Sequence, residues 1–341
     1  MEQAVQQLVG AMARGDRADV LWVADEHVDA SAAAAIAAGG GAHALTNRCD
    51  VASSLRAHGI ATVLADFDFD AAPPARQIAF RVAKEKALVH HVINRALARL
   101  PEGGCLWLAG AKNEGIKTYI DKAARYGGDC DIERGAVWVA RITRTGALTE
   151  PLPDQDYAQL RPVRLGADLE VWSKPGIFGW QKLDAGSEFL IAHLSQVWPQ
   201  PPRRVLDLGC GYGYLTVMAA RSWPDAFFVA TDNNVTAVAA CARNLHAFAI
   251  AGDCVTADCG ADIDGGFDAL LCNPPFHQGF DTEGELTDRF LRSAARLLRR
   301  GGRALFVVNQ FIGLERRAAG LFSDARVPAR NPSFKLVVLE R

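Results

Sequence analysis

The chain has 341 residues, a length typical of two domains that each have their own hydrophobic core. Half of the residues are hydrophobic and the formal net charge is −2, as in an ordinary globular protein. This balance argues against binding of a polyanion over the whole surface, but it leaves room for a local basic face. We find no apolar run long enough to span a membrane and no signal peptide, and therefore expect a cytoplasmic protein.

The eight cysteines are scattered through strand and helix patterns without a C-x-x-C pair. Cys254 and Cys259 lie too far apart for the usual zinc knuckle, and no cluster of histidines accompanies them. We therefore expect reduced thiols and no metal site.

Strand and helix patterns alternate through the first half, as in an α/β domain. We predict strands at 19–23, 61–65 and 105–110, and helices at 31–38, 50–58, 84–100 and from 111–117 onward. The proline-bearing segment 148–154 is a linker, and we place the domain boundary after residue 158.

The second half follows the order of a doubly wound sheet. We predict a hairpin at 163–165 and 169–172, and strands at 205–208, 227–232, 253–257, 267–272, 304–309 and 334–339. Helices are expected at 189–197, 216–222, 283–300 and from the cap residue Asn234 to about His246.

The two halves have parallel layouts, with a helix, a proline stop and a hydrophobic strand in each. In the first half this series leads to strand 105–110, and in the second half to strand 205–208. In the first half, the end of this strand and the turn after it read Ala-Gly-Ala-Lys-Asn-Glu-Gly. This segment lacks the acid at the strand end and the three alternating glycines that the second half has there. We interpret the first half as a degenerate duplicate kept for substrate binding or stability. Two independent α/β domains are the alternative.

A glycine-rich turn follows strand 205–208. Gly209, Gly211 and Gly213 have the spacing G-x-G-x-G, which lets the backbone approach a ligand closely. A dinucleotide fingerprint would be G-x-G-x-x-G, with a pyrophosphate at the helix terminus. Asp207 at the strand end would repel a pyrophosphate but suits the ammonium of an amino-acid ligand. The turn therefore favours S-adenosylmethionine over NAD.

Two further acids follow the ends of the next strands. Asp232 closes strand 227–232, at the distance expected for binding ribose hydroxyls, and fits either cofactor. Asp258 follows strand 253–257 and could accept a hydrogen bond from the adenine amino group. A solvated loop acid is the alternative for Asp258.

The segment Asn273-Pro274-Pro275-Phe276 follows strand 267–272. Its prolines remove two N–H donors and make the turn rigid. The Asn side chain and a free carbonyl offer two acceptors for a planar –NH2 group, and the Phe offers a face for stacking. The turn predicts a substrate with an exocyclic amine on a flat ring. A proline-rich loop with a buried Phe is the alternative.

Basic and aromatic residues interleave in the segment 174–182, which includes Lys174, Phe178 and Lys182. Loops of this kind hold single-stranded nucleic acid, although a turn anchored by two aromatics has the same composition. From Leu286 onward the chain has twelve Lys or Arg against four acids. This flank is either a solvated face or an RNA-contacting one.

In this order, Asp207, the glycine turn, Asp232 and Asn273-Pro274-Pro275-Phe276 resemble class I methyltransferases that act on exocyclic amines. The flanking sequences are similar to those of ribosomal RNA guanine-N2 methyltransferases, over the segments 110–117, 174–180, 183–187 and 273–279. The first two of these segments look most like the small-subunit (16S, RsmC-type) branch. The large-subunit branch shares the two-domain plan and the Asn-Pro-Pro-Phe-His turn.

The resemblance implies an α/β protein of two tandem class I methyltransferase (Rossmann-like) domains. Residues 1–158 would form the degenerate domain, and residues 159–341 the domain with an intact S-adenosylmethionine site. The implied reaction is methylation of the N2 amine of a guanosine in small-subunit ribosomal RNA, free or within the subunit. Two covalently joined domains also favour a monomer that resembles a dimer.

Each singled-out residue then has an expected role. Asn273 and the Pro274 carbonyl accept the N–H groups of the amine, and Phe276 stacks on the base. The expected cofactor residues are Asp207, Gly209, Gly211, Gly213, Asp232 and Asp258. The expected RNA contacts are Lys174, Phe178, Lys182, Lys112 and Lys117.

Other functions remain open at this point. An NAD-dependent oxidoreductase would use a similar glycine turn but has no use for Asn-Pro-Pro-Phe. An RNA-binding assembly factor without activity has no need for Asp207, Asp232 and Asn273 together. Within methyl transfer, the alternatives are large-subunit RNA and an adenine-N6 or glutamine-N5 target, because those enzymes share the Asn-Pro-Pro-Phe turn.

Overall fold

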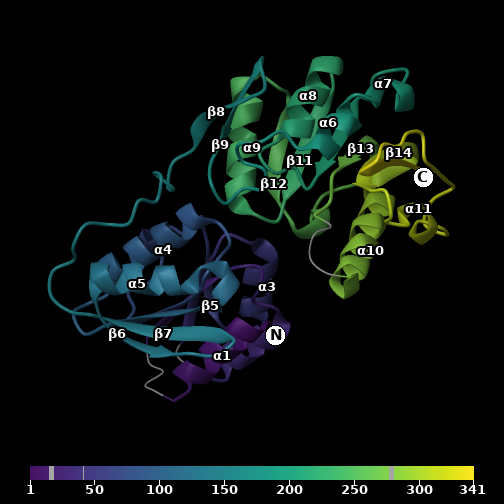
Figure 1. Ribbon diagram of the computed structural model, residues 1–341. Coiled ribbons are helices and arrows are strands. Elements are labelled where there is room, and N and C mark those ends of the chain that lie inside the picture. The colour runs from purple at the N-terminus through teal and green to yellow at the C-terminus, as the bar shows by residue number, and fades with distance from the viewer. Residues whose placement is uncertain (15–18, 41, 276–279) are drawn as a thin grey trace. The chain divides into compact units, whose positions relative to one another are not determined.

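The computed structural model of the protein describes residues 1–14, 19–40, 42–275 and 280–341 (Figure 1). The chain divides into two compact units, Met1–Gln159 and Leu160–Arg341. Within the described residues, no helix combines the length and hydrophobicity that crossing a bilayer requires.

The first unit is built on a seven-stranded sheet of order β3-β2-β1-β4-β5-β7-β6. Strands β3 to β5 in this order run parallel, whereas β7 is antiparallel to both of its neighbours. The strands are β1 (Val20–Ala24), β2 (Ala42–Thr46), β3 (Ala61–Leu64), β4 (Gln77–Arg81), β5 (Cys105–Ala111), β6 (Gly128–Glu133) and β7 (Val137–Arg144). The helices are α1 (Gln3–Met12), α2 (Ala30–Ala37), α3 (Cys49–Ala57), α4 (Lys86–Arg99) and α5 (Ile116–Gly127), with short 3-10 turns η1 (Phe69–Ala71) and η2 (Lys112–Glu114).

The second unit repeats this plan, with the order β12-β11-β10-β13-β14-β16-β15. Its sheet contains β10 (Arg204–Leu208), β11 (Phe227–Asp232), β12 (Gly252–Thr256), β13 (Phe267–Cys272), β14 (Leu298–Asn309), β15 (Asp324–Arg326) and β16 (Phe334–Glu340). The helices are α6 (Ala185–Ile191), α7 (Leu194–Val197), α8 (Tyr214–Ser222), α9 (Val235–Ala247), α10 (Phe280–Leu297) and α11 (Leu314–Arg317), with the 3-10 turn η3 (Asp258–Gly260). A separate hairpin of β8 (Arg161–Leu165) and β9 (Leu169–Ser173) precedes them. The predicted fold class is confirmed, because both units are α/β sheets of one topology.

The central parallel strands are apolar at nearly every position because helices cover both faces of each sheet (Figure 1). In β10, Val205 packs in the same cluster as Leu215 of α8, while Leu206 packs on the opposite face with Leu291 of α10. One position departs from this pattern, because Asp207 is also fully buried.

Strand order fixes the place of a ligand site in the second unit. The chain leaves β10 toward β11 and β12 on one side, and later returns to β13 and β14 on the other side. In doubly wound sheets the crevice at such a reversal, beyond the carboxyl ends of the strands, is the usual binding site. The residues that follow β10, β11, β12 and β13 therefore meet at one edge.

Several elements were not predicted from the sequence. The short strands β2 and β4, the antiparallel pair β6 and β7, and helix α1 lacked a clear periodic pattern. The prediction of one continuous helix at 189–197 was wrong, both in where the helix starts and in its being uninterrupted. The helix begins at Ala185, where the Asp184 side chain caps it, and it is interrupted between α6 and α7.

The alignment of the two halves was also wrong. It matched strand 105–110 with strand 205–208, but β5 occupies the place of β14, and β1 occupies the place of β10. A helix, a stop and a strand recur in every unit of an α/β fold, so this pattern alone cannot fix the register.

The Val-Leu pair that β1 (20–21) shares with β10 (205–206) aligns these strands and places Trp22 with Asp207. Sheet register then extends the alignment to the neighbouring strands. Asp207 is paired with Ala230 and Leu271, which lie two residues before Asp232 and Asn273. Trp22 of β1 is paired in the same way with residues that lie two before Thr46 and Arg81. Trp22, Thr46 and Arg81 thus occupy the places of Asp207, Asp232 and Asn273.

The side chain of Asn244 in α9 joins three parts of the second unit. It is fully buried, donates to the carbonyls of Trp172 in β9 (2.9 Å) and Tyr212 in the glycine turn (2.7 Å), and accepts from the Trp172 N–H (2.7 Å). Both polar atoms of the amide are used, so the hairpin and the turn are fixed to one helix.

Replacing Asn244 by Ala should lower the free energy of unfolding by about 2–4 kcal/mol, because the Trp172 N–H and the carbonyls of Trp172 and Tyr212 lose this partner. Urea unfolding measures the change. His246→Ala, an exposed position on the same helix, should shift stability by no more than about 0.5 kcal/mol. Equal effects of the two substitutions would contradict the role of Asn244.

Candidate active site

The glycine turn after β10 is held by the end of the neighbouring strand. The N–H groups of Gly209 and of the next residue both donate to the Thr231 carbonyl, at 2.8 and 2.9 Å. Gly209, Gly211 and Gly213 have φ angles of 84°, 54° and 89°, which glycine adopts without a Cβ penalty. A Cβ at Gly213 would also lie 2.7 Å from the Cys241 sulfur. The path of the turn therefore requires glycine.

Asp207 lies beneath this turn. Its Oδ2 accepts hydrogen bonds from the N–H (3.1 Å) and hydroxyl (2.7 Å) of Thr216 in α8. Its Oδ1 is buried and has no hydrogen-bond partner among the described residues. Burial raises the pKa of Asp207 to about 7, the bonds from Thr216 oppose this rise, and the charge of Asp232 adds to it. A cationic ligand group near Oδ1 would stabilise the charged carboxylate.

Asp232 connects the end of β11 to the glycine turn. Its Oδ2 accepts from the Gly211 N–H and its Oδ1 accepts from the Asn234 N–H, both at 3.0 Å. Asn234 in turn caps α9 by accepting from the Thr236 N–H, as predicted. Asp232 thus lies at the carboxyl edge, next to the backbone that would face a ligand.

Asp258 begins the 3-10 turn η3, which follows β12 after one residue. Its carboxylate forms an ion pair with Arg289 of α10. Asp258 is therefore more than a solvated loop acid, which was the alternative, because it links η3 to α10. A contact from Asp258 to a bound adenine stays a prediction.

Asn273 and Pro274 follow β13, on the far side of β10 from Asp232. The Asn273 amide nitrogen donates to Asp184 Oδ1 at 2.6 Å and to Ser187 Oγ at 2.9 Å. Pro274 is buried and Asn273 is partly exposed. Phe276, the expected stacking residue, lies outside the described residues.

Asp184 and Ser187 were not predicted as site residues. They lie 89 and 86 positions before Asn273, so no local pattern joins them to it. A signal was present, because an Asp three residues before a polar Ser is a typical helix start. This pattern predicts that Asp184 caps a helix, but it does not predict that Asp184 also contacts Asn273.

The segment 174–182 only partly matches its expected role. Phe178 is 66 % exposed and Lys182 is exposed, as a contact surface requires. Lys174 is only 1 % exposed, so its predicted contact with RNA phosphate was wrong. A basic residue next to a turn can pack inward with its stem, which composition does not reveal. Lys112 and Lys117 in the first unit are exposed.

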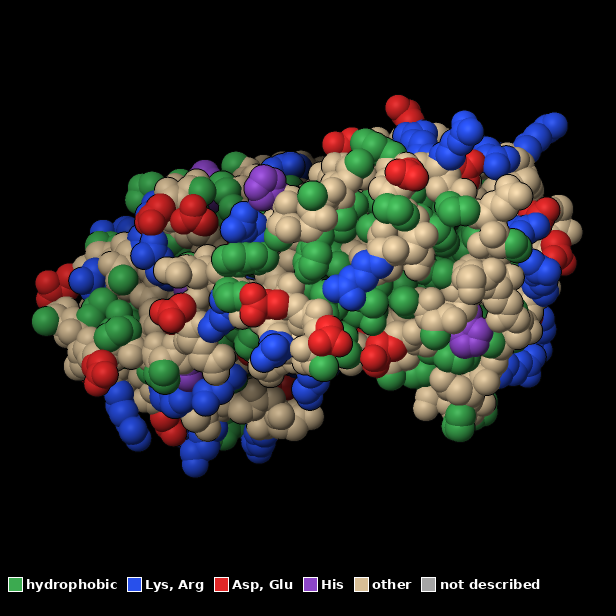
Figure 2. Space-filling model, turned by 90° about the horizontal axis from the view of Figure 1, so that it is seen from above, with side chains coloured by type: hydrophobic (Ala, Val, Ile, Leu, Met, Phe, Trp, Pro, Cys, Tyr) green, Lys and Arg blue, Asp and Glu red, His purple; other side chains and the backbone are tan. Residues whose placement is uncertain are grey.

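The basic residues after Leu286 are partly used within the second unit. Five of the twelve form ion pairs and two donate to backbone carbonyls, namely Arg289, Arg299, Arg303, Arg317, Lys335, Arg296 and Arg341. Figure 2 shows Lys and Arg side chains gathered at the right-hand edge, where the last elements of the chain lie. The others are exposed, at Arg292, Arg300, Arg316, Arg326 and Arg330.

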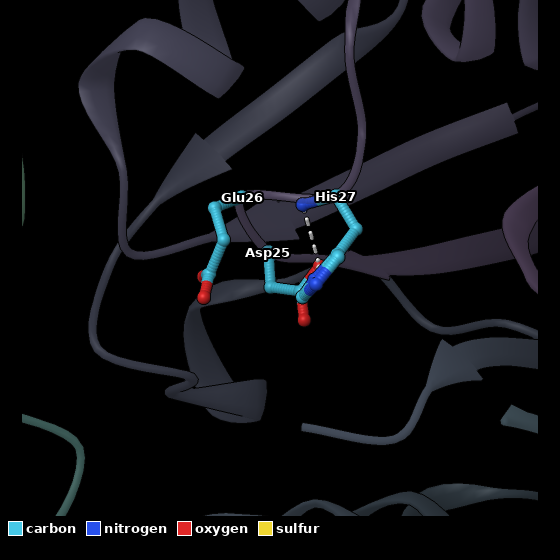
Figure 3. Close-up of side chains that lie close together, drawn as sticks. All are labelled: Asp25, Glu26 and His27. Carbon is cyan, nitrogen blue, oxygen red and sulfur yellow. Dashed lines mark hydrogen bonds and ion pairs between the residues drawn. The ribbon is translucent and has the colours of Figure 1, made fainter. Parts of the chain in front are cut away.

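The described residues of the first unit contain no equivalent of the glycine turn. In its place the chain after β1 runs through Asp25, Glu26 and His27, none of which has a positive φ (Figure 3). Asp25 Oδ1 accepts from the His27 backbone N–H at 3.0 Å and contacts the His27 Nδ1 at 3.1 Å. Asp25 therefore uses this oxygen for contacts within its own turn.

Arg81 fills the position that corresponds to Asn273. It is 6 % exposed and pairs with Glu114 at 2.5 Å and with Glu2 at 3.6 Å. An arginine offers hydrogen-bond donors only, so a buried arginine paired with two acids presents no acceptor to a ligand. The described residues of the first unit thus share the sheet topology of the second unit but place other side chains at the positions of its candidate site.

Comparison with known proteins identifies the family. Residues 168–338 match the methyltransferase small domain family. The chain is 31 % identical over 264 residues to ribosomal RNA small subunit methyltransferase C of Pseudomonas paraeruginosa, covering 76 % of this chain and 77 % of that one. The protein of the same name from Hahella chejuensis is 30 % identical over 267 residues, 76 % of each chain. The chain belongs to the ribosomal RNA small subunit methyltransferase C family.

A solved structure agrees with this family over both units. The T. thermophilus 16S rRNA N2 G1207 methyltransferase (RsmC), in complex with AdoMet and guanosine, matches with a TM-score of 0.82 and 24 % identity. The match covers 99 % of this chain and 91 % of that one. The predicted family is confirmed, and the two-unit fold is one that a family member adopts.

Asp207→Asn should change how stability depends on pH. The pKa of Asp207 is raised from 3.8 to about 7, so between these values the folded state holds a proton that the unfolded state has lost. Wild-type stability should fall as pH rises through this range, by at most about 1.4 kcal/mol per pH unit. The variant lacks this loss, so its stability relative to wild type should increase up to about pH 7 and then level off.

Urea unfolding at several pH values would measure this difference. Asp225→Asn is the matched control, because Asp225 is exposed. Parallel profiles for wild type and the Asp207 variant would contradict the raised pKa.

Proposed function

We propose that the protein transfers a methyl group from S-adenosylmethionine to the N2 amine of a guanosine in small-subunit ribosomal RNA. One observation carries the proposal. The Asn273-Pro274 turn, whose Asn donates its amide N–H groups to Asp184 and Ser187, follows β13 at the switch point beside the glycine turn. This arrangement supports the proposal, because the proposed amine acceptors and the proposed cofactor turn follow neighbouring strands at one sheet edge.

The residues at this edge suit S-adenosylmethionine. Asp207 Oδ1 is buried and has no partner among the described residues. It would therefore be stabilised by accepting a hydrogen bond from the ammonium of the methionine moiety. Asp232 would accept from the ribose hydroxyls, and Asp258 from the adenine amino group. The positive φ angles of the glycine turn allow the backbone to approach the methionine end closely. These assignments explain why an acid lies at or near the end of each of three adjacent strands.

When bound, S-adenosylmethionine supplies an electrophilic methyl group on a sulfonium. The guanine N2 is a poor nucleophile because its lone pair is delocalised into the ring. Accepting its two N–H groups, by Asn273 Oδ1 and the Pro274 carbonyl, would localise that lone pair. The same acceptors would stabilise the positive charge that develops on the nitrogen.

The bonds balance as a simple displacement. The N2 lone pair forms the N–C bond, the C–S pair returns to sulfur, and the amine then releases one proton. The described residues offer no strong base at Asn273, so positioning supplies much of the acceleration. Phe276, outside the described residues, is proposed to stack on the extruded base.

The substrate follows from the relatives. Those reported above are small-subunit ribosomal RNA methyltransferases by name, and the matching structure contains guanosine. Family membership sets aside the NAD-dependent alternative. Large-subunit RNA and an adenine or glutamine amine remain outcomes of the test below.

The first unit would serve RNA binding or stability rather than transfer, because Arg81 fills its acceptor position. We propose Phe178, Lys182, Lys112 and Lys117 as RNA contacts. The protein would act in the cytoplasm as a monomer, since one chain contains two units of the same topology.

The decisive experiment measures methyl incorporation from labelled S-adenosylmethionine into separated ribosomal subunits and their free RNAs, followed by nucleoside analysis. We expect N2-methylguanosine in small-subunit RNA. Label in large-subunit RNA would keep the chemistry and change the substrate. Label in adenosine or in protein would overturn the guanine assignment.

Two substitutions should separate transfer from cofactor binding. Asn273→Ala should reduce the transfer rate by on the order of a hundredfold to a thousandfold, because it removes one acceptor of the amine. Its S-adenosylmethionine affinity should change no more than a few-fold. Asp232→Ala should instead weaken that affinity by about tenfold or more. Calorimetry and single-turnover transfer measure the two effects, and retention of transfer by Asn273→Ala would contradict the mechanism.

A further inference from the structure

Asp184 and Ser187 contact the acceptor residue from a separate helix. Asp184 caps α6, where its Oδ1 accepts from the Ser187 N–H at 3.3 Å. The same oxygen accepts from the Asn273 amide at 2.6 Å, the shorter of the two bonds. The cap is therefore also a partner of the site.

These contacts determine which way the Asn273 amide faces. A carboxylate only accepts hydrogen bonds, so the amide must present its nitrogen to Asp184. The Ser187 hydroxyl lies 3.5 Å from Asp184 Oδ1, to which it donates, and its lone pairs then accept from Asn273 at 2.9 Å. Both partners favour one orientation, which turns Asn273 Oδ1 away from them.

We infer that Asp184, with Ser187, is a positioning residue for methyl transfer, which holds the Asn273 amide with its oxygen toward the substrate amine. The inference rests on the proposed function. The negative charge of Asp184 also polarises the amide and makes Oδ1 a better acceptor for the charge that develops on the amine. An amide free to flip would present N–H groups to the amine for part of the time.

The first unit contains a similar contact, in which a helix-cap acid also reaches the end of a neighbouring strand. There the cap of α1, Glu2, lies 3.6 Å from Arg81, the last residue of β4 and the counterpart of Asn273. The contact is thus part of the shared architecture, with α1 preceding β1 as α6 precedes β10. Where the acceptor has become an arginine, the cap acid forms an ion pair. In the second unit, where this position is Asn273, the cap acid accepts a hydrogen bond from the amide nitrogen.

An exchange of the two residues tests this inference. Asp184→Asn keeps a good helix cap but can donate as well as accept, so both orientations of Asn273 become possible. Transfer should fall about tenfold, while cofactor affinity and unfolding midpoint stay near wild type. Asn273→Asp places two carboxylates at one hydrogen bond and should lose transfer and stability.

The double variant Asp184→Asn with Asn273→Asp restores one donor and one acceptor, in exchanged positions. The new amide at the helix cap would donate to the new carboxylate after β13, whose other oxygen then faces the amine. We expect this variant to transfer methyl groups at least about tenfold faster than Asn273→Asp alone and to recover stability. Asp29→Asn, a helix-cap substitution in the first unit, is the matched control and should leave transfer unchanged.

Each outcome has one meaning. Recovery of both transfer and stability supports the positioning role. Recovery of stability alone, or of neither, overturns it, because a cap without a positioning role predicts no rescue of transfer. If wild type methylates no RNA while S-adenosylmethionine still binds, the proposed function fails and this inference fails with it. An active wild type with an inactive exchanged pair overturns the inference alone.

Discussion

The site depends on one constraint, the shared carboxyl edge of parallel strands. Four adjacent strands, β12, β11, β10 and β13, end on the same side, so residues far apart in sequence meet there. The Thr231 carbonyl shows the coupling, because the end of β11 binds the first two N–H groups of the turn after β10. A shift of one strand would displace both the cofactor turn and the acid beside it.

The candidate-site residues that sequence predicted are those whose position depends on local structure. Asp207, the glycines, Asp232 and Asn273 each lie at the end of a hydrophobic strand or directly after one, and strand ends are visible in sequence. The Asp184–Asn273 bond joins residues 89 positions apart, so only the fold reveals it. The burial of Lys174 was hidden for a similar reason, since a charged residue reads as exposed until its packing is known.

The two units share one sheet topology, but they differ in the side chains at the positions of the candidate site. The places of Asp207, Asp232 and Asn273 are taken by Trp22, Thr46 and Arg81 at equal sheet register. An aromatic side chain replaces the buried acid and an ion-paired arginine replaces the acceptor. This alignment was not visible in the sequence, because short strands such as β4 lacked a pattern that would anchor it.

The arginine in the first unit has a consequence for binding stoichiometry. Arg81 is buried and paired with Glu2 and Glu114, so admitting a cofactor there would break two ion pairs and leave the buried guanidinium without its acids. With the cofactor site proposed in the second unit, we therefore expect the cofactor to titrate as a single site, although the chain contains two copies of the topology. We also expect no cooperativity between the two halves toward the cofactor.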